Sequence, residues 1–166
     1  MSTRCQIHVN NSNVLLYRHQ DGYPEGVLPD ILPTIKRFIG IRGFDVEYLP
    51  ARLIVALVEA QNKVYQGLID RYKEDGRPQS YITDAEESRD TLSIGVTAFD
   101  NGEGLAGDIE YLYVVEKDRV RVMVPTRDFY KAPRPSLAFF KLLKDVDFDG
   151  NPSKPPEKRR KKEKVA

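Results

Sequence analysis

Residues 17–26 hold the densest group of side chains that could bind a ligand. They include two tyrosines, an arginine, a histidine and two carboxylates: Tyr17, Arg18, His19, Asp21, Tyr23 and Glu25. Tyrosine rings stack on planar ligands, and a guanidinium pairs with an anionic group through two hydrogen bonds. The glycines and proline of residues 21–26 predict a stiff turn, and groups on a stiff backbone suit a binding site. The alternative is a turn that only packs against the following helix.

Two carboxylates, Asp108 and Glu110, lie two residues apart in a second polar segment. In the strand expected over residues 108–116 they share one face, ~7 Å apart. Such a pair could bind a divalent cation or act as an acid–base pair. If the two segments converge, a hard metal ion could be held by His19, Asp21, Asp108 and Glu110. The simpler interpretation of the pair is the solvent face of an edge hairpin.

Arg4 opens the first expected strand and lies across a predicted hairpin from Arg18. The two guanidinium groups could hold a phosphate or a carboxylate. Tyr111 would then add a third stacking face to the same site. The alternative is a surface ion pair with Asp21 or Glu25.

Several motifs that carry enzymatic chemistry do not occur in the chain. It contains no phosphate-binding glycine loop, no dinucleotide-binding glycine pattern, no cysteine pair and no His-Glu-x-x-His. Two histidines and one cysteine leave few ligands for a tetrahedral zinc ion. Cys5 and His8 lie three residues apart on a strand and therefore face opposite sides, so we do not expect them to form a nucleophile pair. Cys5 is instead expected to be a small core residue. No cofactor is expected.

The C-terminal residues form a strongly basic segment. Residues 151–166 contain seven basic and two acidic residues, whereas the other 150 residues carry a net charge of −4. Prolines and charged residues there cannot bury enough apolar surface to offset chain entropy, so we expect a disordered tail. Its cations could bind nucleic acid non-specifically through phosphate contacts, or could only solubilise the chain. The cations assigned to this role are Lys158, Arg159, Arg160, Lys161, Lys162 and Lys164.

Hydrophobic periodicity divides the rest of the chain into strands and helices. Alternating apolar residues predict strands over residues 4–9, 14–19, 91–99, 108–116 and 119–125. Helical spacing of apolar residues predicts helices over residues 27–39, 48–73 and 136–146. Residues 79–90 are polar and acidic, and we expect a surface connection there.

This order of elements, ββααβββα, predicts an α+β fold. We expect a single antiparallel sheet of about five strands with helices packed on one face. The length fits one domain over residues 1–148, followed by the tail at 149–166. A lone cysteine excludes an internal disulfide, and no secretory signal or membrane segment is recognised, which predicts a soluble cytoplasmic protein that does not bind membranes. The sequence leaves homo-oligomerisation open.

The chain resembles a group of small uncharacterised proteins of phages, archaea and bacteria. The resemblance lies in the opening Ser-Thr-Arg strand (residues 2–4), the Tyr-x-His-x-Asp-Gly-Tyr-Pro turn (residues 17–24) and Gly-Asp-Ile-Glu-Tyr (residues 107–111). It covers most of the first 125 residues, and a tryptophan often stands in the relatives where Gln20 stands here. The resemblance implies that the turn and the later acidic segment belong together.

These observations favour a non-catalytic binding protein for a small anionic, nucleotide-like ligand. The residues predicted to bind it are Arg4, Tyr17, Arg18, His19, Asp21, Tyr23, Glu25 and Tyr111. The likeness to phage proteins adds the expectation of a viral or mobile-element origin and a role in host interaction, such as sequestering a signal. Two alternatives stay open: a metal-dependent hydrolase or nuclease, and a nucleic-acid-associated accessory protein that acts through the tail.

Overall fold

The computed structural model describes residues 3–91, 94–100 and 103–153. In chain order its elements are β1 (Cys5–Val9), β2 (Val14–Arg18), α1 (Pro24–Arg42), α2 (Leu49–Glu74), α3 (Gln79–Asp90), β3 (Ile94–Ala98), β4 (Tyr111–Val115), β5 (Val120–Pro125), the 3-10 helices η1 (Phe129–Lys131) and η2 (Leu137–Phe139), and β6 (Phe140–Val146). None of the helices in these described stretches is long and apolar enough to cross a membrane.

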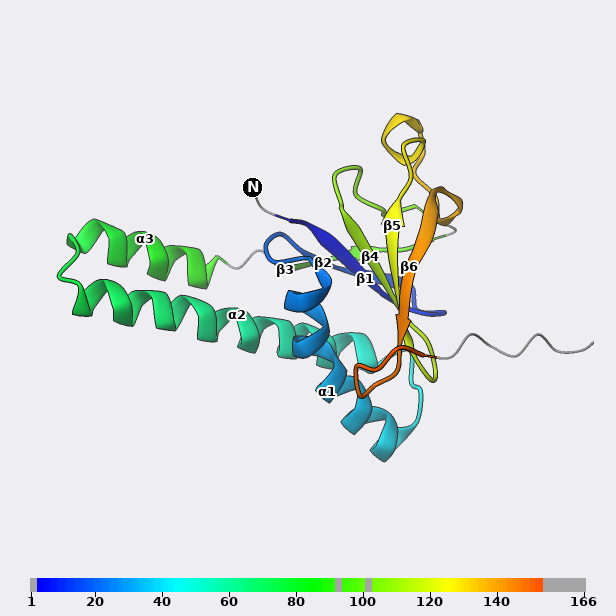
Figure 1. Cartoon of the computed structure of the whole chain (residues 1–166), viewed down its shortest axis with the longest axis horizontal. Helices are drawn as coiled ribbons and strands as arrows, with labels where there is room; N and C mark the ends of the chain where they lie inside the picture. Colours follow the sequence, from blue (N-terminus) through cyan, green and yellow to red (C-terminus); the bar gives the residue numbers. More distant parts are fainter. Residues whose placement is uncertain (1–2, 92–93, 101–102, 154–166) are drawn as a thin grey trace, which may run out of the picture.

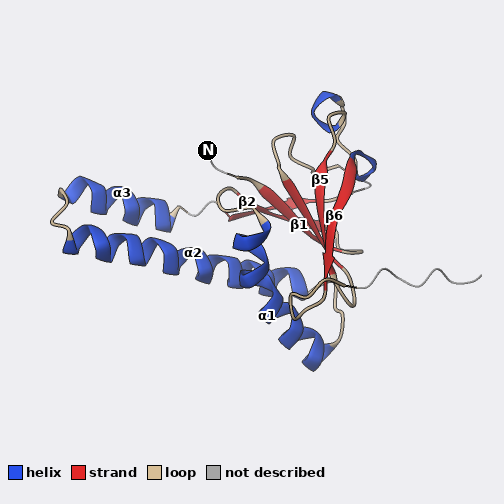
Figure 2. Cartoon of the chain, viewed as in Figure 1, coloured by secondary structure: helices blue, strands red, loops and turns tan. Residues whose placement is uncertain are grey.

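The strands form one six-stranded sheet in the order β3-β2-β1-β4-β5-β6 (Figure 2). β1 and β4 pair in parallel at its centre, and every other neighbouring pair is antiparallel. The α+β class and the single sheet are confirmed, whereas the expected antiparallel sheet of about five strands is only partly right, because the sheet is mixed and has six strands. The parallel pair arises because the chain leaves β3 at one edge and returns to the middle of the sheet, beside β1.

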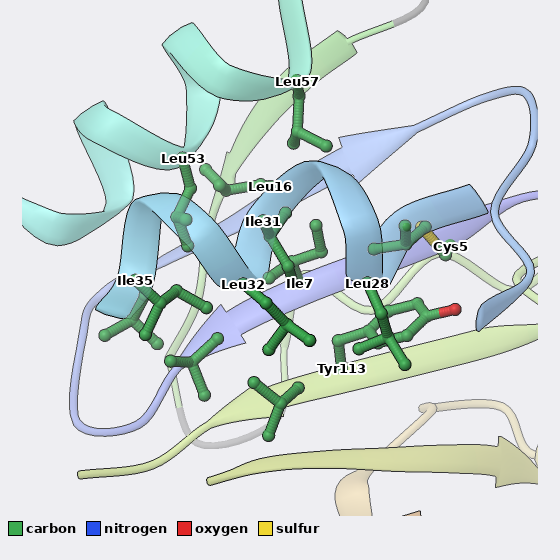
Figure 3. Close-up of a cluster of buried hydrophobic side chains, with 14 of the residues drawn as sticks. Cys5, Ile7, Leu16, Leu28, Ile31, Leu32, Ile35, Leu53, Leu57 and Tyr113 are labelled. Carbon is green, nitrogen blue, oxygen red and sulfur yellow. The ribbon is translucent and has the colours of Figure 1, made fainter. Parts of the chain in front are cut away.

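The main hydrophobic core lies between the sheet and two helices, α1 and α2. Alternate residues of β1, including Ile7, face this core, as does Leu16 of β2. Ile31 and Ile35 of α1 and Leu53 of α2 pack against them, as Figure 3 shows. The opposite face of the sheet carries a second cluster, which the loops after β3 and β5 cover.

Residues 79–90 form the helix α3 instead of the expected surface connection. α3 packs on the distal part of α2, and the two helices project beyond the sheet as an arm (Figure 1). Only Ile82 and Ala85 of α3 are buried, against Ile69 of α2. Two buried residues in a twelve-residue helix make too short a stripe to stand out from the sequence.

Residues 136–146 are not the expected helix, because they divide into η2 and the edge strand β6. Phe140 pairs with Pro125 and Val146 with Val120 of β5, through a register shift at Val122/Met123. The spacing of Leu137, Phe140 and Leu143 imitates a helical stripe, but Leu143 is exposed. Pairing with β5 therefore overrides the local pattern.

The chain stays attached to the sheet beyond β6. The Ser153 amide donates to the Asp145 carbonyl, and the Asp147 amide donates to the Asn151 carbonyl, both over 2.9 Å. The first residues of the predicted tail therefore hydrogen-bond to β6 and the turn that follows it. Residues 154–166, with all the cations assigned to nucleic-acid binding, lie outside the described residues.

Gly22 joins three segments at the start of β1. Its amide donates to the Thr3 carbonyl over 2.9 Å, and its carbonyl accepts a 2.8 Å hydrogen bond from the hydroxyl of Tyr113 in β4. A Cβ on Gly22 would lie 2.8 Å from the Thr3 oxygen and from the Arg4 carbonyl carbon. Only glycine permits this approach, because backbone atoms cannot move aside as a flexible side chain can.

We expect Gly22→Ala to lower the free energy of unfolding by about 3 kcal/mol, since the added methyl group would push β1 away from the turn. The matched control is Gly67→Ala in the interior of α2, where a Cβ meets no atom within 4 Å. That change should raise stability by about 0.5–1 kcal/mol through helix propensity. Urea unfolding measures both effects, and a mild Gly22→Ala variant would contradict the close approach.

Candidate functional site

The two segments that the sequence analysis brought together do lie side by side, on either side of the start of β1. The Gly22 amide donates to Thr3, and the Glu110 amide donates to the Arg4 carbonyl over 2.9 Å. Thr3 and Arg4 therefore lie between the turn after β2 and the approach to β4. Asp108 and Glu110 precede β4, which begins at Tyr111, so they do not alternate along a strand as expected.

The sheet separates the predicted ligand-binding residues into two sets. Arg18 and Tyr111 both pair with Cys5 and share its side of the sheet, which faces the helices. Tyr17 pairs with Gln6 and packs in the cluster on the opposite face. One ligand cannot contact both sets from a single side.

Arg18 is held in a structural contact. Its side chain is 6% exposed, its Nη1 lies 2.5 Å from Oδ2 of Asp30 in α1, and its Nε donates to the Gln20 carbonyl over 2.8 Å. This ion pair ties β2 to α1. The guanidinium of Arg18 is therefore occupied and is not presented to solvent.

Arg4, Tyr17 and His19 gather on the loop-covered side of the sheet, but their surroundings do not favour an anion. Arg4 forms an ion pair with Asp108, and the Tyr17 hydroxyl lies 3.0 Å from Nδ1 of His19. Burial raises the pKa of Tyr17, the nearby carboxylate of Asp108 raises it further, and Arg4 opposes both. Asp21, Asp108 and Glu110 are exposed. Asp108 pairs with Arg4 and the Glu110 amide donates to the Arg4 carbonyl, so two of these carboxylates lie next to the group and an anionic ligand would meet repulsion there.

The other predicted residues lie apart from this group. Tyr23 is 40% exposed at the N-cap of α1, and Glu25 lies in the first turn of that helix. Tyr111 packs against the main core, with its ring centroid 6.4 Å from that of Tyr113. The predicted set therefore forms no single cavity.

The metal alternative lacks a site in the part of the chain that the structure describes. No three His, Cys, Asp or Glu side chains gather there as a metal ion requires. Asp108 instead pairs with Arg4, and His19 contacts Tyr17. The four residues considered for the metal, His19, Asp21, Asp108 and Glu110, thus do not assemble into one coordination shell.

Cys5 is a core residue, as the sequence indicated. It is fully buried, and this burial raises the pKa of its thiol to about 12. The thiol therefore stays protonated at neutral pH and is not a nucleophile.

A groove between α1 and α2, which the sequence analysis missed, offers free cationic groups. α1 ends at Arg42, where Gly43 adopts a positive φ of 79° and donates to the Ile39 carbonyl over 2.9 Å. The chain then reverses, and the Asp45 carboxylate accepts from the amide of Tyr48 just before α2 begins. The end of α1 and the start of α2 therefore lie side by side (Figure 1).

The groove has a volume of about 480 Å³, apolar walls and a cationic rim. Phe38 and Ile41 of α1 and Val55 of α2 contribute apolar surface. The charged groups that line it are Arg37, Arg42, Arg52 and Glu59. Arg42 is already paired with Asp45, but Arg37 and Arg52 still outnumber Glu59, so the groove keeps the positive potential that the predicted site lacks.

The three arginines differ in how far they are already engaged. Arg42 stacks 4.0 Å above the centre of the Tyr48 ring, and its Nε lies 3.3 Å from Asp45. Arg37 and Arg52 form no ion pair or side-chain hydrogen bond within the described residues. The sequence does contain a signal for this groove: Arg37 and Arg42 precede the glycine that ends α1, and Arg52 lies in the first turn of α2.

Comparisons with protein-family models, with curated proteins and with solved structures found no match to this chain. The resemblance to small phage, archaeal and bacterial proteins therefore stays a prediction. The function must be argued from the geometry of the chain itself.

We expect Asp30→Ala to destabilise the fold by about 3 kcal/mol, because it leaves the buried guanidinium of Arg18 without its counter-charge. The control is Asp149→Ala, which removes an exposed ion pair with Lys36. That change should cost less than ~1 kcal/mol. Thermal unfolding compares the two variants, and equal small losses would show that the Arg18 contact is not structural.

Proposed function

We propose that this protein binds, without catalysis, a small anionic ligand of nucleotide-like chemistry, and that the groove between α1 and α2 is its site. The observation that carries the proposal is the pair of unengaged guanidinium groups, Arg37 and Arg52, on the rim of an apolar groove. A guanidinium without a carboxylate partner is available for bidentate pairing with a phosphate or carboxylate.

The walls of the groove suit a planar group joined to that anion. Phe38, Ile41 and Val55 supply apolar surface, and Tyr48 presents an exposed ring beside them. An aromatic base would bury apolar area against these side chains and stack on the tyrosine or on a guanidinium plane. A ligand with both an aromatic ring and a phosphate therefore matches the groove better than inorganic phosphate alone.

Size and local charge agree with a single small molecule. A volume of about 480 Å³ lies within the range of small-molecule sites. The groove also adjoins the N-terminal end of α2, whose first turn contains no acidic residue. The Asp45 carboxylate already partners the positive end of the α2 dipole, so the attraction for an anion comes from the guanidinium groups of the groove.

The lining residues support binding in preference to catalysis. The groove is lined by no histidine or cysteine, and Glu59 is its one carboxylate. A general acid paired with a base, or an activated nucleophile, would need groups of those types within hydrogen-bond reach. The arrangement therefore supports retention of a ligand and not its conversion.

The direct test is calorimetric titration with a nucleoside, its monophosphate and its triphosphate. We expect the phosphorylated probes to bind more tightly than the nucleoside, with an affinity that falls as salt rises. Arg37→Ala and Arg52→Ala should each weaken binding about tenfold, the expected effect of losing one charge-assisted contact. Neither change should lower the melting temperature appreciably.

Arg71→Ala is the matched control, because Arg71 is an exposed arginine in the last turn of α2, away from the groove. It removes the same charge from the helix that carries Arg52, and it should leave the affinity unchanged. Binding that survives the double Arg37→Ala/Arg52→Ala variant, or that Arg71→Ala weakens equally, would refute this site.

A further inference from the structure

A second cavity, of about 490 Å³, lies at the far end of β1 and has a different chemistry. Three segments distant in the sequence surround it: the β1–β2 turn, the residues that follow β3, and η2. The Phe99 amide donates to the Asn13 carbonyl over 2.8 Å and so fixes two of these segments to each other. The cavity walls are therefore held by the fold.

His8 lines this cavity and is nearly fully buried, with an exposed fraction of 4%. Its Nε2 lies 3.1 Å from the Ser12 carbonyl oxygen. Since a carbonyl can only accept, Nε2 must carry the hydrogen, and Nδ1 of the neutral ring is an acceptor. Burial lowers the pKa of His8, which favours this neutral form.

Nδ1 of His8 has no hydrogen-bond partner among the described residues. A buried acceptor without a donor costs about 1–3 kcal/mol, and native proteins leave few such groups unsatisfied. The ring of Phe99, 4.4 Å from that of His8, covers another side of the imidazole. Nδ1 has less than 1 Å² of exposed surface, so a donor such as a ligand hydroxyl group reaches it only when a neighbouring side chain of the lining moves aside.

The rim of the cavity is polar and nearly uncharged. The amide side chains of Asn11 and Asn13 and the hydroxyl of Ser136 line it, and none of these three groups has a hydrogen bond within the described residues. Each can donate and accept. Asp100 is the one charged group in the lining, and it is an acceptor.

From these groups we infer that the cavity binds an uncharged, hydroxyl-rich ligand, a saccharide, with one hydroxyl donating to Nδ1 of His8. Closely spaced hydroxyl groups offer a donor and an acceptor at each position, as the asparagine and serine side chains require. Phe99 supplies the apolar surface against which the C–H face of a sugar ring packs. No cation lines the cavity, so a phosphorylated ligand would lack a counter-charge and would meet Asp100.

This inference does not depend on the proposed anion site. His8 lies on the face of the sheet opposite α1 and α2, because it alternates with the core residues Ile7 and Val9 along β1. Saccharide binding and nucleotide binding can therefore succeed or fail separately.

The test is an NMR titration of the full chain with glucose, N-acetylglucosamine and maltose, and with glucose 6-phosphate for comparison. We expect the uncharged sugars to shift the amide resonances of residues 8–13, 99–100 and 136–138 and the imidazole Nδ1 resonance of His8. Asn13→Ala and Asp100→Ala should each weaken binding up to about tenfold, the loss of one hydrogen bond. Both residues are exposed, so the melting temperature should hold.

Asn62→Ala, which removes an exposed amide from α2, is the control and should change nothing. His8→Phe keeps an aromatic ring and removes the acceptor, and if it folds it should abolish the shifts. The inference is overturned if none of the uncharged sugars shifts these resonances. It is also overturned if Asn13→Ala and Asp100→Ala leave the affinity unchanged, or if glucose 6-phosphate binds more tightly than glucose.

Discussion

The hydrogen bond from the Tyr113 hydroxyl to the Gly22 carbonyl holds together the part of the molecule on which the rest depends. It joins the turn after β2 to β4, with the start of β1 enclosed between them. Figure 3 shows the Tyr113 ring lying across the same core as Cys5 and Leu28, beneath α1. Once β1 is fixed between two partners, its alternation directs Ile7 to the helices and His8 to the loops, so the cavity that His8 lines lies on the loop-covered side of the sheet.

The predicted site and the proposed site both contain arginines, and they differ in whether those guanidinium groups are already paired with a carboxylate. Arg18 is cationic, but it is buried against Asp30, and Arg4 is paired with Asp108. A guanidinium that already neutralises a carboxylate attracts a second anion less strongly, because the carboxylate cancels much of its charge. Arg37 and Arg52 have no such carboxylate partner within the described residues, which is why we propose the groove between α1 and α2 as the anion site.

Local sequence patterns predicted much of the fold, but they could not predict contacts between segments that are distant in the sequence. The β1–β2 and β4–β5 hairpins and the two long helices follow from periodicity and turn residues. The parallel pairing of β1 with β4 joins residues that lie about a hundred positions apart, and no local signal encodes it. The predicted site residues are divided for a related reason: adjacent residues such as Tyr17 and Arg18 point to opposite faces of the sheet.

The groove combines walls fixed by the packing of two helices with exposed arginine side chains on its rim. These two parts would contribute differently to its selectivity among ligands. Ile35 of α1 and Leu49 of α2 are fully buried in the main core, and this packing fixes the distance between the two helices that form the walls of the groove. The rim arginines are long side chains, so ordering them on a ligand costs conformational entropy that offsets part of each charge contact. The apolar walls need no such ordering. Shape selectivity should therefore come from the planar group of the ligand, while the anion contributes attraction that salt can screen.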